Sequence, residues 1–400
     1  GVVILEVLHL FPIMYLNVVG SYAMIDPSLE EAARGLGAKG AALFRSVTLP
    51  LLMPGFFAGA SIVFIWALTD LGTPLLFEYR AVAPVQIFNY VQATQENLIG
   101  YALVIVVLAI TVLFFGAAKF IFGRQKYDMP AFGRTAGQVT RLSAPVKALV
   151  CAGMGLFCAV ALVPHASVLL VSVSKDWFMS VLPEQWTLEY YGKVFEHPLA
   201  MLSVKNSLAL SGLAVAVVLV MGGAIAYYLS RKKFRGRELL DMCAMLPLAV
   251  PGVVLAYGYV QSYFGTSLDP RLNPVPLLVR AMYSGFQQSS ITLEEASASL
   301  GAGPLKTLSN VTFPIIRANL LGAAILGFAF SMLEVSDSLI LAMREEYYPM
   351  TKAIYMLMGR LGDGGYIASA MGILGVVLLA GALMLAQRLI GKRLGDLFRA

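Results

Sequence analysis

Long apolar runs separated by short polar segments constrain this chain more than any other feature of its sequence. About 20 mostly apolar residues in a helix cross the hydrocarbon core of a bilayer, and runs of that kind recur along the chain. Of its 400 residues, 58% are hydrophobic and only 13% are charged. A soluble domain of this length carries roughly twice that share of charge. The sequence therefore predicts an all-α, polytopic membrane protein.

We expect about nine transmembrane helices in this chain. Their expected positions are residues 1–24, 55–76, 98–122, 145–173, 204–230, 240–264, 275–290, 319–342 and 366–390. Pro274 and Pro276 interrupt the start of the seventh run and disfavour a continuous helix there.

Two basic clusters set the expected orientation in the membrane. They consist of Arg231, Lys232, Lys233, Arg235 and Arg237, and of Arg388, Lys392, Arg393 and Arg399. Segments rich in Lys and Arg face the cytoplasm, so the clusters are expected there. Counting alternate crossings also places the segments 25–54, 123–144 and 290–318 inside. The net charge of +6 is thus explained by orientation, and we expect no nucleic-acid partner.

A polar segment that joins two apolar runs occurs twice, with the copies 264 residues apart. The first copy is Glu31-Ala32-Ala33-Arg34-Gly35-Leu36-Gly37 followed by Val47-Thr48-Leu49-Pro50. The second is Glu295-Ala296-Ser297-Ala298-Ser299-Leu300-Gly301 followed by Val311-Thr312-Phe313-Pro314. Helix capping alone would not keep the Gly and Pro positions in register, so we expect the segment to have a shared function.

The same segment predicts two short helices that project from the membrane. Pro27 is tolerated in a first helical turn, and Ser28 with Glu31 has the spacing of a capping box. Gly37 is expected to end the first helix. A second short helix is then expected to run until Pro50, which would reset the backbone before the next span.

On these residues the repeated segment resembles the cytoplasmic loop of ABC importer permeases, which docks on the ATPase subunit. The whole chain resembles the permease subunit of type I ABC importers, in particular the fused two-half permeases of the ferric-iron group, to which thiamine and phosphonate permeases are close. Trp66-Ala67-Leu68-Thr69-Asp70-Leu71-Gly72-Thr73-Pro74 and Leu333-Glu334-Val335-Ser336-Asp337-Ser338 resemble the group's span after the loop. Ser297 and Phe313 depart from its pattern.

The resemblance implies two tandem permease halves. Residues 1–122 would be the C-terminal part of the first half with coupling loop 25–54, residues 123–144 a cytoplasmic linker, and residues 145–400 the second half with coupling loop 290–318. The second copy begins near residue 141, so the repeat predicts a first half that is truncated at its N-terminus by about 125 residues.

The resemblance also implies a mechanism and its partners. A periplasmic substrate-binding protein would deliver cargo to this chain in the bacterial inner membrane, and two copies of a cytoplasmic ATPase subunit would drive transport. The residues expected to couple to the ATPases are Glu30, Glu31, Ala32, Ala33, Gly37, Pro50, Glu294, Glu295, Ala296, Gly301 and Pro314. Ferric iron is the expected cargo; thiamine, phosphonate, polyamine and sulfate remain alternatives, as does an ion-coupled secondary transporter.

Three acidic residues lie within or beside the expected spans. Asp70 and Glu334 hold equivalent positions in the two copies, and Asp337 follows Glu334 by three residues. Ionisable residues in membrane spans suggest function, and carboxylates suit a cation such as Fe(III). We therefore expect the three to line the translocation path, against the alternative that they only lie at the water interface.

No enzyme, metal or cofactor signature accompanies these features. The P-loop needs Gly and Lys adjacent after four intervening residues, and Pro304 and Leu305 break that spacing between Gly303 and Lys306. The three cysteines and three histidines are scattered. The sequence thus predicts a translocation subunit without catalytic residues, resident metal or cofactor, whose ATP is bound by a separate subunit.

Overall fold

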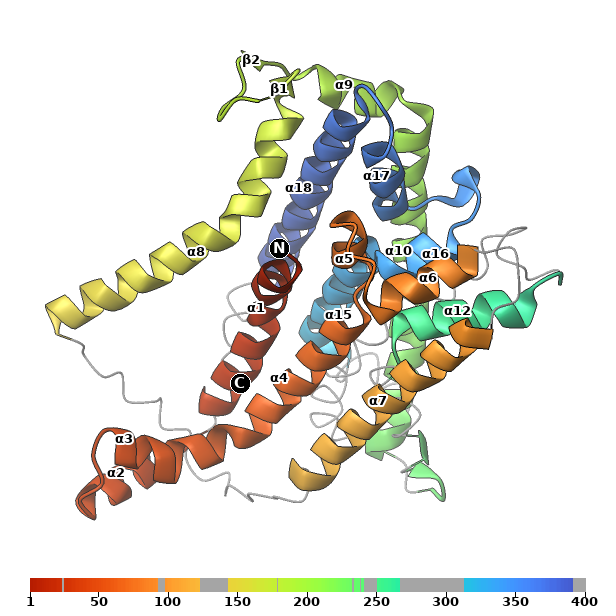
Figure 1. Ribbon diagram of the computed structural model, residues 1–400. Helices are drawn as coiled ribbons and strands as arrows, with labels where there is room; N and C mark the ends of the chain where they lie inside the picture. Colours follow the sequence, from red (N-terminus) through yellow and green to blue (C-terminus); the bar gives the residue numbers. More distant parts are fainter. Residues whose placement is uncertain are drawn as a thin grey trace.

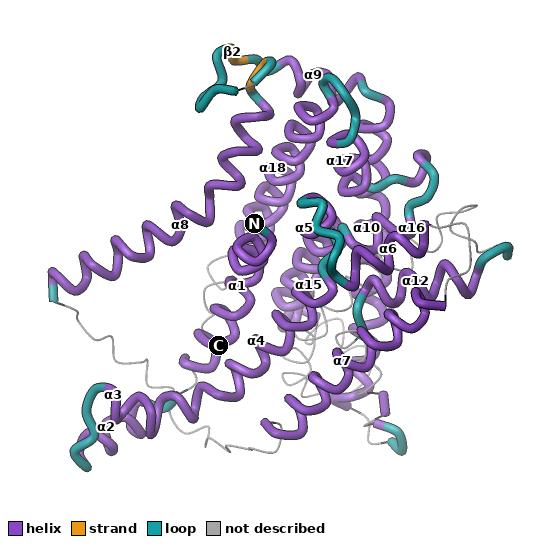
Figure 2. Tube along the Cα trace, in the orientation of Figure 1, coloured by secondary structure: helices purple, strands orange, loops and turns teal. Residues whose placement is uncertain are grey.

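The computed structural model describes residues 1–23, 25–92, 98–122, 143–177, 179–231, 234–237, 239–240, 250–266 and 313–390. Apart from one short hairpin, these residues form a bundle of helices, as the sequence predicted (Figures 1 and 2). Two predicted regions, the span at 275–290 and the linker from 123 to 142, lie outside the described residues.

All the secondary-structure elements described in the first part of the chain are helices. Its elements are α1 (Val2–Ala23), α2 (Pro27–Gly35), α3 (Ala41–Leu43), a π-helical segment (Phe44–Thr48), α4 (Leu49–Thr69), α5 (Gly72–Leu76), α6 (Ala83–Gln92) and α7 (Leu98–Phe122).

The second part adds a two-stranded antiparallel hairpin. Its elements are α8 (Ala144–Ser172), β1 (Ser174–Lys175), β2 (Gln185–Trp186), α9 (Glu189–Glu196), α10 (Pro198–Arg231), α12 (Gly252–Tyr263), α15 (Phe313–Leu333), α16 (Ser336–Leu341), the 3-10 turn Glu345–Tyr347, α17 (Met350–Met358) and α18 (Gly364–Ile390). In the hairpin, Ser174 pairs with Trp186 and Lys175 with Gln185.

Among the described residues, five helical stretches are long and apolar enough to cross a membrane. They are Val2–Ala23, Ala41–Leu76, Ala144–Ser172, Pro198–Ile225 and Gly364–Ala382. Shorter apolar helices cover Leu98–Phe114 and Leu320–Leu333. The chain is therefore a multi-pass membrane protein.

The repeat found in the sequence is also a repeat in the fold. Helix α4 runs from Leu49 to Thr69 and α15 from Phe313 to Leu333, so both ends of the two helices are 264 residues apart. The sequence predicted single helices at 55–76 and 319–342, and both predictions were wrong in the same way. Helix α4 ends at Thr69 and α15 ends at Leu333, and a short helix follows each of them, α5 or α16.

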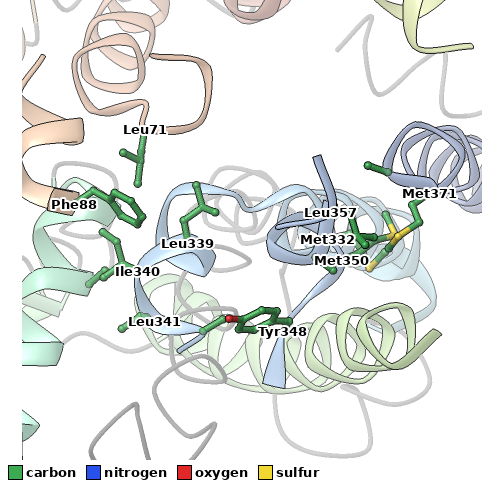
Figure 3. Packing of buried hydrophobic residues seen from close by; sticks show 14 of the residues in the cluster. Leu71, Phe88, Met332, Leu339, Ile340, Leu341, Tyr348, Met350, Leu357 and Met371 are labelled. Atoms are coloured by element: carbon green, nitrogen blue, oxygen red, sulfur yellow. The ribbon is translucent and has the colours of Figure 1, made fainter. Parts of the chain in front are cut away.

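The largest buried cluster joins the two copies. Leu71 and Phe88 come from the first copy, and Leu339 and Ile340 come from α16 in the second; all four are at most 8% exposed. Figure 3 shows Leu71 above Leu339, and Phe88 beside Ile340. Burial of this apolar surface holds the two copies together.

Lys352 of α17 lies at the edge of this cluster, only 5% exposed. Its Nζ donates a hydrogen bond of 2.8 Å to the carbonyl oxygen of Leu339 and lies 5.6 Å from the centroid of the Tyr348 ring. Burial lowers the pKa of Lys352 from 10.5 to about 8, because an apolar surrounding disfavours the charged ammonium.

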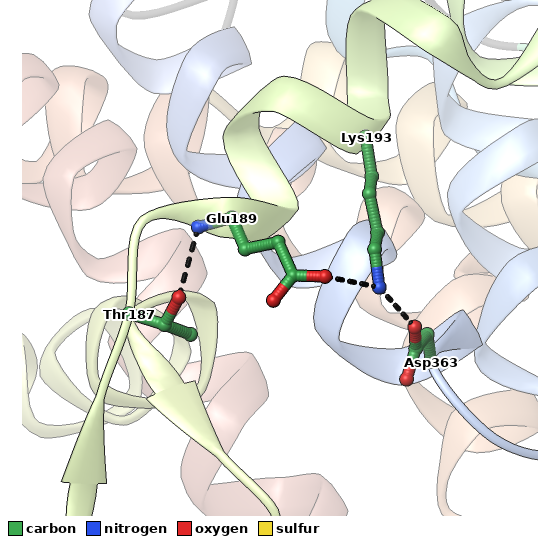
Figure 4. A network of polar contacts seen from close by, with 4 residues as sticks. All are labelled: Thr187, Glu189, Lys193 and Asp363. Carbon is green, nitrogen blue, oxygen red and sulfur yellow. Dashed lines mark hydrogen bonds and ion pairs between the residues drawn. The ribbon is translucent and has the colours of Figure 1, made fainter.

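An ion-pair network joins elements at the end of the bundle that carries α9 (Figure 4). Lys193 of α9 lies between Glu189, at 2.8 Å, and Asp363, which precedes α18. The carboxylates of Asp363 and Glu189 raise the pKa of Lys193 above its usual value. Tyr190 and Tyr366 stack beside this network, with ring centroids 4.9 Å apart. Short helix α9 is thereby attached to α18.

Candidate functional site: the projecting loop and the axis between the copies

Helices α2 and α3 project from one end of the bundle, opposite the end that carries α9 (Figure 1). Asp26 caps α2, because its Oδ1 accepts a 2.9 Å hydrogen bond from the backbone N–H of Ser28. The same contact lowers the pKa of Asp26. The predicted capping box of Ser28 and Glu31 was therefore wrong by two residues: the cap is Asp26, with Pro27 in the first turn as expected.

Gly37 ends α2 as predicted. It has a φ of +94°, a conformation that residues with a side chain rarely adopt. The N–H of Gly37 bonds to the carbonyl of Arg34 at 3.0 Å, and the N–H of Ala38 bonds to that of Ala33 at 3.0 Å. These two bonds form a Schellman motif. Gly37 is thus required by the turn that reverses the chain between α2 and α3.

Pro50 does not separate a short helix from the next span, so that prediction was wrong. The chain is helical from Ala41 through Pro50 to Thr69, with a π-helical segment at Phe44–Thr48. Proline lacks an N–H and is tolerated at the start of a regular helical segment, and Pro50 stands in the first turn of α4. The projecting loop is therefore continuous with the membrane helix behind it.

The two predicted coupling glutamates of the first loop have different surroundings. Glu30 is held inward: its carboxylate accepts a 2.8 Å hydrogen bond from Thr48 Oγ1 and pairs with Arg34 at 3.3 Å. Glu31 is exposed. Ala32 is exposed and Ala33 half-buried. Glu30 thus fastens α2 to the π-helical segment, and Glu31 faces outward.

Sequence reasoning missed the apolar part of the loop surface. Leu36 is 91% exposed and Leu29 is 43% exposed, on the same short helix and its cap as Glu31. The signal in the sequence was a leucine placed directly before the turn glycine. Large exposed apolar side chains next to a charged group are typical of a protein-binding surface.

Most of the second predicted loop lies outside the described residues. Glu294, Glu295, Ala296 and Gly301 lie outside the described residues, and Pro314 stands in the first turn of α15. Coupling by this loop stays a prediction.

Equivalent residues of the two copies meet beyond the loops. Trp66 of α4 and Phe330 of α15 are 264 positions apart, and their rings pack edge to face with centroids separated by 5.6 Å. Residues equivalent by a two-fold repeat touch one another only near the axis that relates the copies. The pseudo-two-fold axis therefore passes between α4 and α15.

A reciprocal contact lies one to two turns further along. The N–H of Leu71 donates to Ser336 Oγ at 3.3 Å, and Gly72 faces Val335, whose Cγ1 would be 3.1 Å from a Cβ at Gly72. Leu71 is equivalent to Val335 and Gly72 to Ser336, so each copy contributes the same pair of positions. The two copies are closed against each other at this level.

The three predicted path residues surround this contact. Asp70 stands one residue before the N-cap of α5, and its Oδ2 accepts from the N–H of Thr73 in the first turn at 2.9 Å. Glu334 stands at the same place before α16, and its Oε1 accepts from the N–H of Asp337 at 3.2 Å. Asp337 itself is fully buried. The structure thus gives the two equivalent carboxylates a common role as N-terminal caps.

Glu6 is a further acidic residue at this place that the sequence analysis had not assigned. Its carboxyl group hydrogen-bonds with the side chains of Asp70 and Thr73. The available signal was an acidic residue in an otherwise apolar span. Among the described residues no group of three or more Asp, Glu, His or Cys side chains is placed to hold a metal ion.

Residues 1–127 match the family described as "Binding-protein-dependent transport system inner membrane component". The permease FbpB of the ferric transport system of Actinobacillus pleuropneumoniae is 27% identical over 409 residues, covering 98% of this chain and 58% of the relative. The putative ferric transport system permease FbpB 1 of Haemophilus influenzae is 28% identical, and the match covers 85% of this chain and 56% of that relative.

The chain thus spans a little more than half the length of these permease relatives. A shorter match is WtpB, the molybdate/tungstate permease of Pyrococcus furiosus, with 26% identity over 47% of this chain and 78% of the relative. Among solved structures, a bacterial alginate ABC transporter in complex with a periplasmic protein gives a TM-score of 0.50 at 16% identity, covering 62% of this chain. That likeness identifies an ABC permease fold.

Proposed function

We propose that this permease is the translocation subunit of an ATP-driven importer and moves ferric iron into the cytoplasm. The observation that carries the proposal is the projecting α2–α3 loop, which presents Glu31 and Leu36 outward while Glu30 fixes it to the membrane helix. A rigid loop with an outward charge and an apolar side chain suits docking to another protein, and its continuity with α4 lets a movement of that protein reach the axis.

Two ATPase subunits are the proposed partners inside, one for each copy of the loop. Glu31, and Glu295 in the second loop, would pair with basic groups of the ATPases, and the small side chains Ala32, Ala33 and Ala296 would permit close contact. Such allosteric coupling requires that the loops and the ATPases make different contacts in two states of the transporter. ATP binding and hydrolysis belong to those subunits in this proposal, and a periplasmic binding protein delivers the cargo outside.

The proposed path runs along the axis between α4 and α15. The contacts of Trp66 with Phe330 and of Leu71 with Ser336 close this axis, so the cargo would pass when the two copies separate there. Asp70, Glu334 and Asp337 stand beside the closure. Once the closing contacts part, their carboxylates would favour a cation over an anion.

The choice of ferric iron rests on relatives named for ferric transport that match over most of this chain. An oxyanion is the second candidate, because relatives named for molybdate and tungstate match over 47% of it. The acidic residues beside the axis favour the cation.

Uptake measurements test the proposal. Cells that carry the complete transporter would be given radiolabelled Fe(III) or molybdate, with and without this gene, at normal and depleted ATP and with the proton gradient held. We expect gene-dependent and ATP-dependent uptake of iron, lost when Glu31 and Glu295 are both replaced by Ala. Uptake that follows the proton gradient and persists without ATP would instead indicate a secondary transporter.

A further inference from the structure

The hairpin after α8 carries a cluster of exposed apolar side chains that the proposed function does not use. We call the segment from 176 to 188 the hairpin loop. Five large apolar side chains in it are at least 60% exposed: Met179 at 92%, Val181 at 93%, Leu182 at 60%, Trp186 at 60% and Leu188 at 71%. Apolar surface of this kind on an outer loop marks an interaction site.

The loop is folded so that these side chains point outward. Trp177 Nε1 donates to the carbonyl of Ser180 at 3.0 Å, and Ser180 Oγ donates to the carbonyl of Leu182 at 2.8 Å. Two backbone carbonyls are thereby paired inside the loop, which lowers the cost of placing it next to lipid. The N–H of Trp177 donates to Tyr366 Oη at 2.9 Å and fastens the loop to α18.

The place of the loop in the fold indicates its partner. Helix α8 has 29 residues, about 44 Å at 1.5 Å per residue, which matches the bilayer with its headgroup regions. Most of α8 is exposed among the described residues, and an 18-residue window of it has a mean hydropathy of 2.2, which suits a span in contact with lipid. Only Val173 separates α8 from β1, so the hairpin directly follows this span, where an interfacial segment is expected.

The position of the hairpin loop in the bundle favours lipid over a soluble protein as its partner. In Figure 1 the hairpin lies above α8, and its loop lies to the left of α9 and α18, away from α4 and α15. A protein that delivers cargo to the axis would cover α4 and α15, whereas the loop stands at the periphery. Tryptophan is enriched at membrane interfaces, and Trp186 lies at this level.

We propose that the hairpin loop inserts Val181, Leu182 and Trp186 into the interface of the outer leaflet and anchors the outer end of α8 there. The loop would fix the tilt and depth of α8 through its attachment to α18. This anchor does not depend on the proposed cargo or on ATP.

Spin labelling in liposomes tests the anchor. In a chain whose Cys151, Cys158 and Cys243 are replaced by Ser, Val181→Cys would be labelled in vesicles of phosphatidylcholine and phosphatidylglycerol. Collisions with lipid-soluble O2 and with a water-soluble nickel complex would be compared. The matched control is Glu184→Cys, an exposed polar position in the same loop.

We expect the ratio of O2 to nickel accessibility to be several-fold higher at position 181 than at position 184. Equal and high nickel accessibility at both positions would overturn the anchor. A label at position 181 that is accessible only to the nickel complex, and that becomes shielded when periplasmic extract is added, would also overturn the anchor. That result would assign the loop to a soluble partner. Monodisperse elution of each labelled protein establishes that it is folded.

Discussion

Trp66 packs edge to face against Phe330, its own equivalent in the second copy of the repeat, with ring centroids 5.6 Å apart. The Leu71–Ser336 contact continues the same closure. The sequence predicts the same orientation for both copies, and parallel repeats of this kind are related by an axis along the membrane normal. In the proposed mechanism these closing contacts would lie on the path of the cargo.

The Trp66–Phe330 pair should show energetic coupling in a double-mutant cycle. An edge-to-face pair contributes about 0.5–1.5 kcal/mol beyond the area it buries, so Trp66→Leu and Phe330→Leu together should cost less than the sum of the single changes by that amount. Thermal unfolding in detergent measures the cycle. Trp66→Leu combined with Phe195→Leu, an exposed position on α9, is the control and should be additive. Additivity for the ring pair would contradict the contact.

Variants of the two glutamates in the first loop should affect different properties, the stability of the loop for Glu30 and the binding of the ATPase for Glu31. Glu30→Gln weakens the contacts to Thr48 and Arg34, so we expect it to loosen α2 and to increase proteolysis of the loop. Glu31→Gln leaves those contacts intact. We expect it to preserve proteolytic resistance and to reduce co-purification of the ATPase subunits.

Limited proteolysis and affinity purification of the assembled transporter check this pair of variants. Arg45→Gln, an exposed change in the π-helical segment of the same loop, controls for the loss of any charge there. Loss of ATPase binding in Glu30→Gln but not in Glu31→Gln would reverse the assigned roles.

Asp70 and Glu334 allow capping to be distinguished from a role on the path. Asparagine can still accept hydrogen bonds at a helix N-terminus, whereas alanine loses the cap at a cost of about 1 kcal/mol. If the charge serves the cargo, Asp70→Asn with Glu334→Gln should impair iron uptake while assembly stays normal. Normal uptake in this pair, with uptake lost only in Asp70→Ala with Glu334→Ala, would reduce both residues to caps.

The sequence predicted the large features because they depend on periodic patterns. The repeat placed α4 and α15 correctly relative to each other, and apolar length placed α1, α7, α8 and α18 to within a few residues. The Gly37 turn was also predictable, since its positive φ favours glycine.

Contacts between distant residues could not be predicted in this way. The breaks after Thr69 and Leu333 depend on Asp70 and Glu334 turning back to cap the next helix, and the apolar run continues through both breaks. The opposite error occurred at Pro50, where a π-helical segment let the helix continue. At these positions tertiary packing overrides the local helix propensity.

Lys352 should make the stability of the protein rise with pH in an alkaline window. Its pKa is about 8 in the fold against an ordinary 10.5, so between these values the unfolded chain binds more protons than the folded one. Stability increases with pH wherever the unfolded state binds more protons. Below about pH 8 the cost of the buried charge is fully present, and by pH 10.5 it is relieved, a change on the order of 3 kcal/mol.

Thermal unfolding in detergent from pH 7 to pH 10.5 measures this window. Lys352→Met keeps a long side chain between Phe88 and Tyr348 but has no ammonium to desolvate, so we expect it to remove the rise and to be no less stable than the wild type at pH 7. The hydrogen bond to the Leu339 carbonyl is lost in this variant, and this loss limits the gain in stability at pH 7. Lys205→Met, an exposed position on α10, should leave the rise intact. A pH profile unchanged by Lys352→Met would mean that the ammonium is hydrated in the folded protein, and that α16 and α17 are held together by their apolar contacts alone.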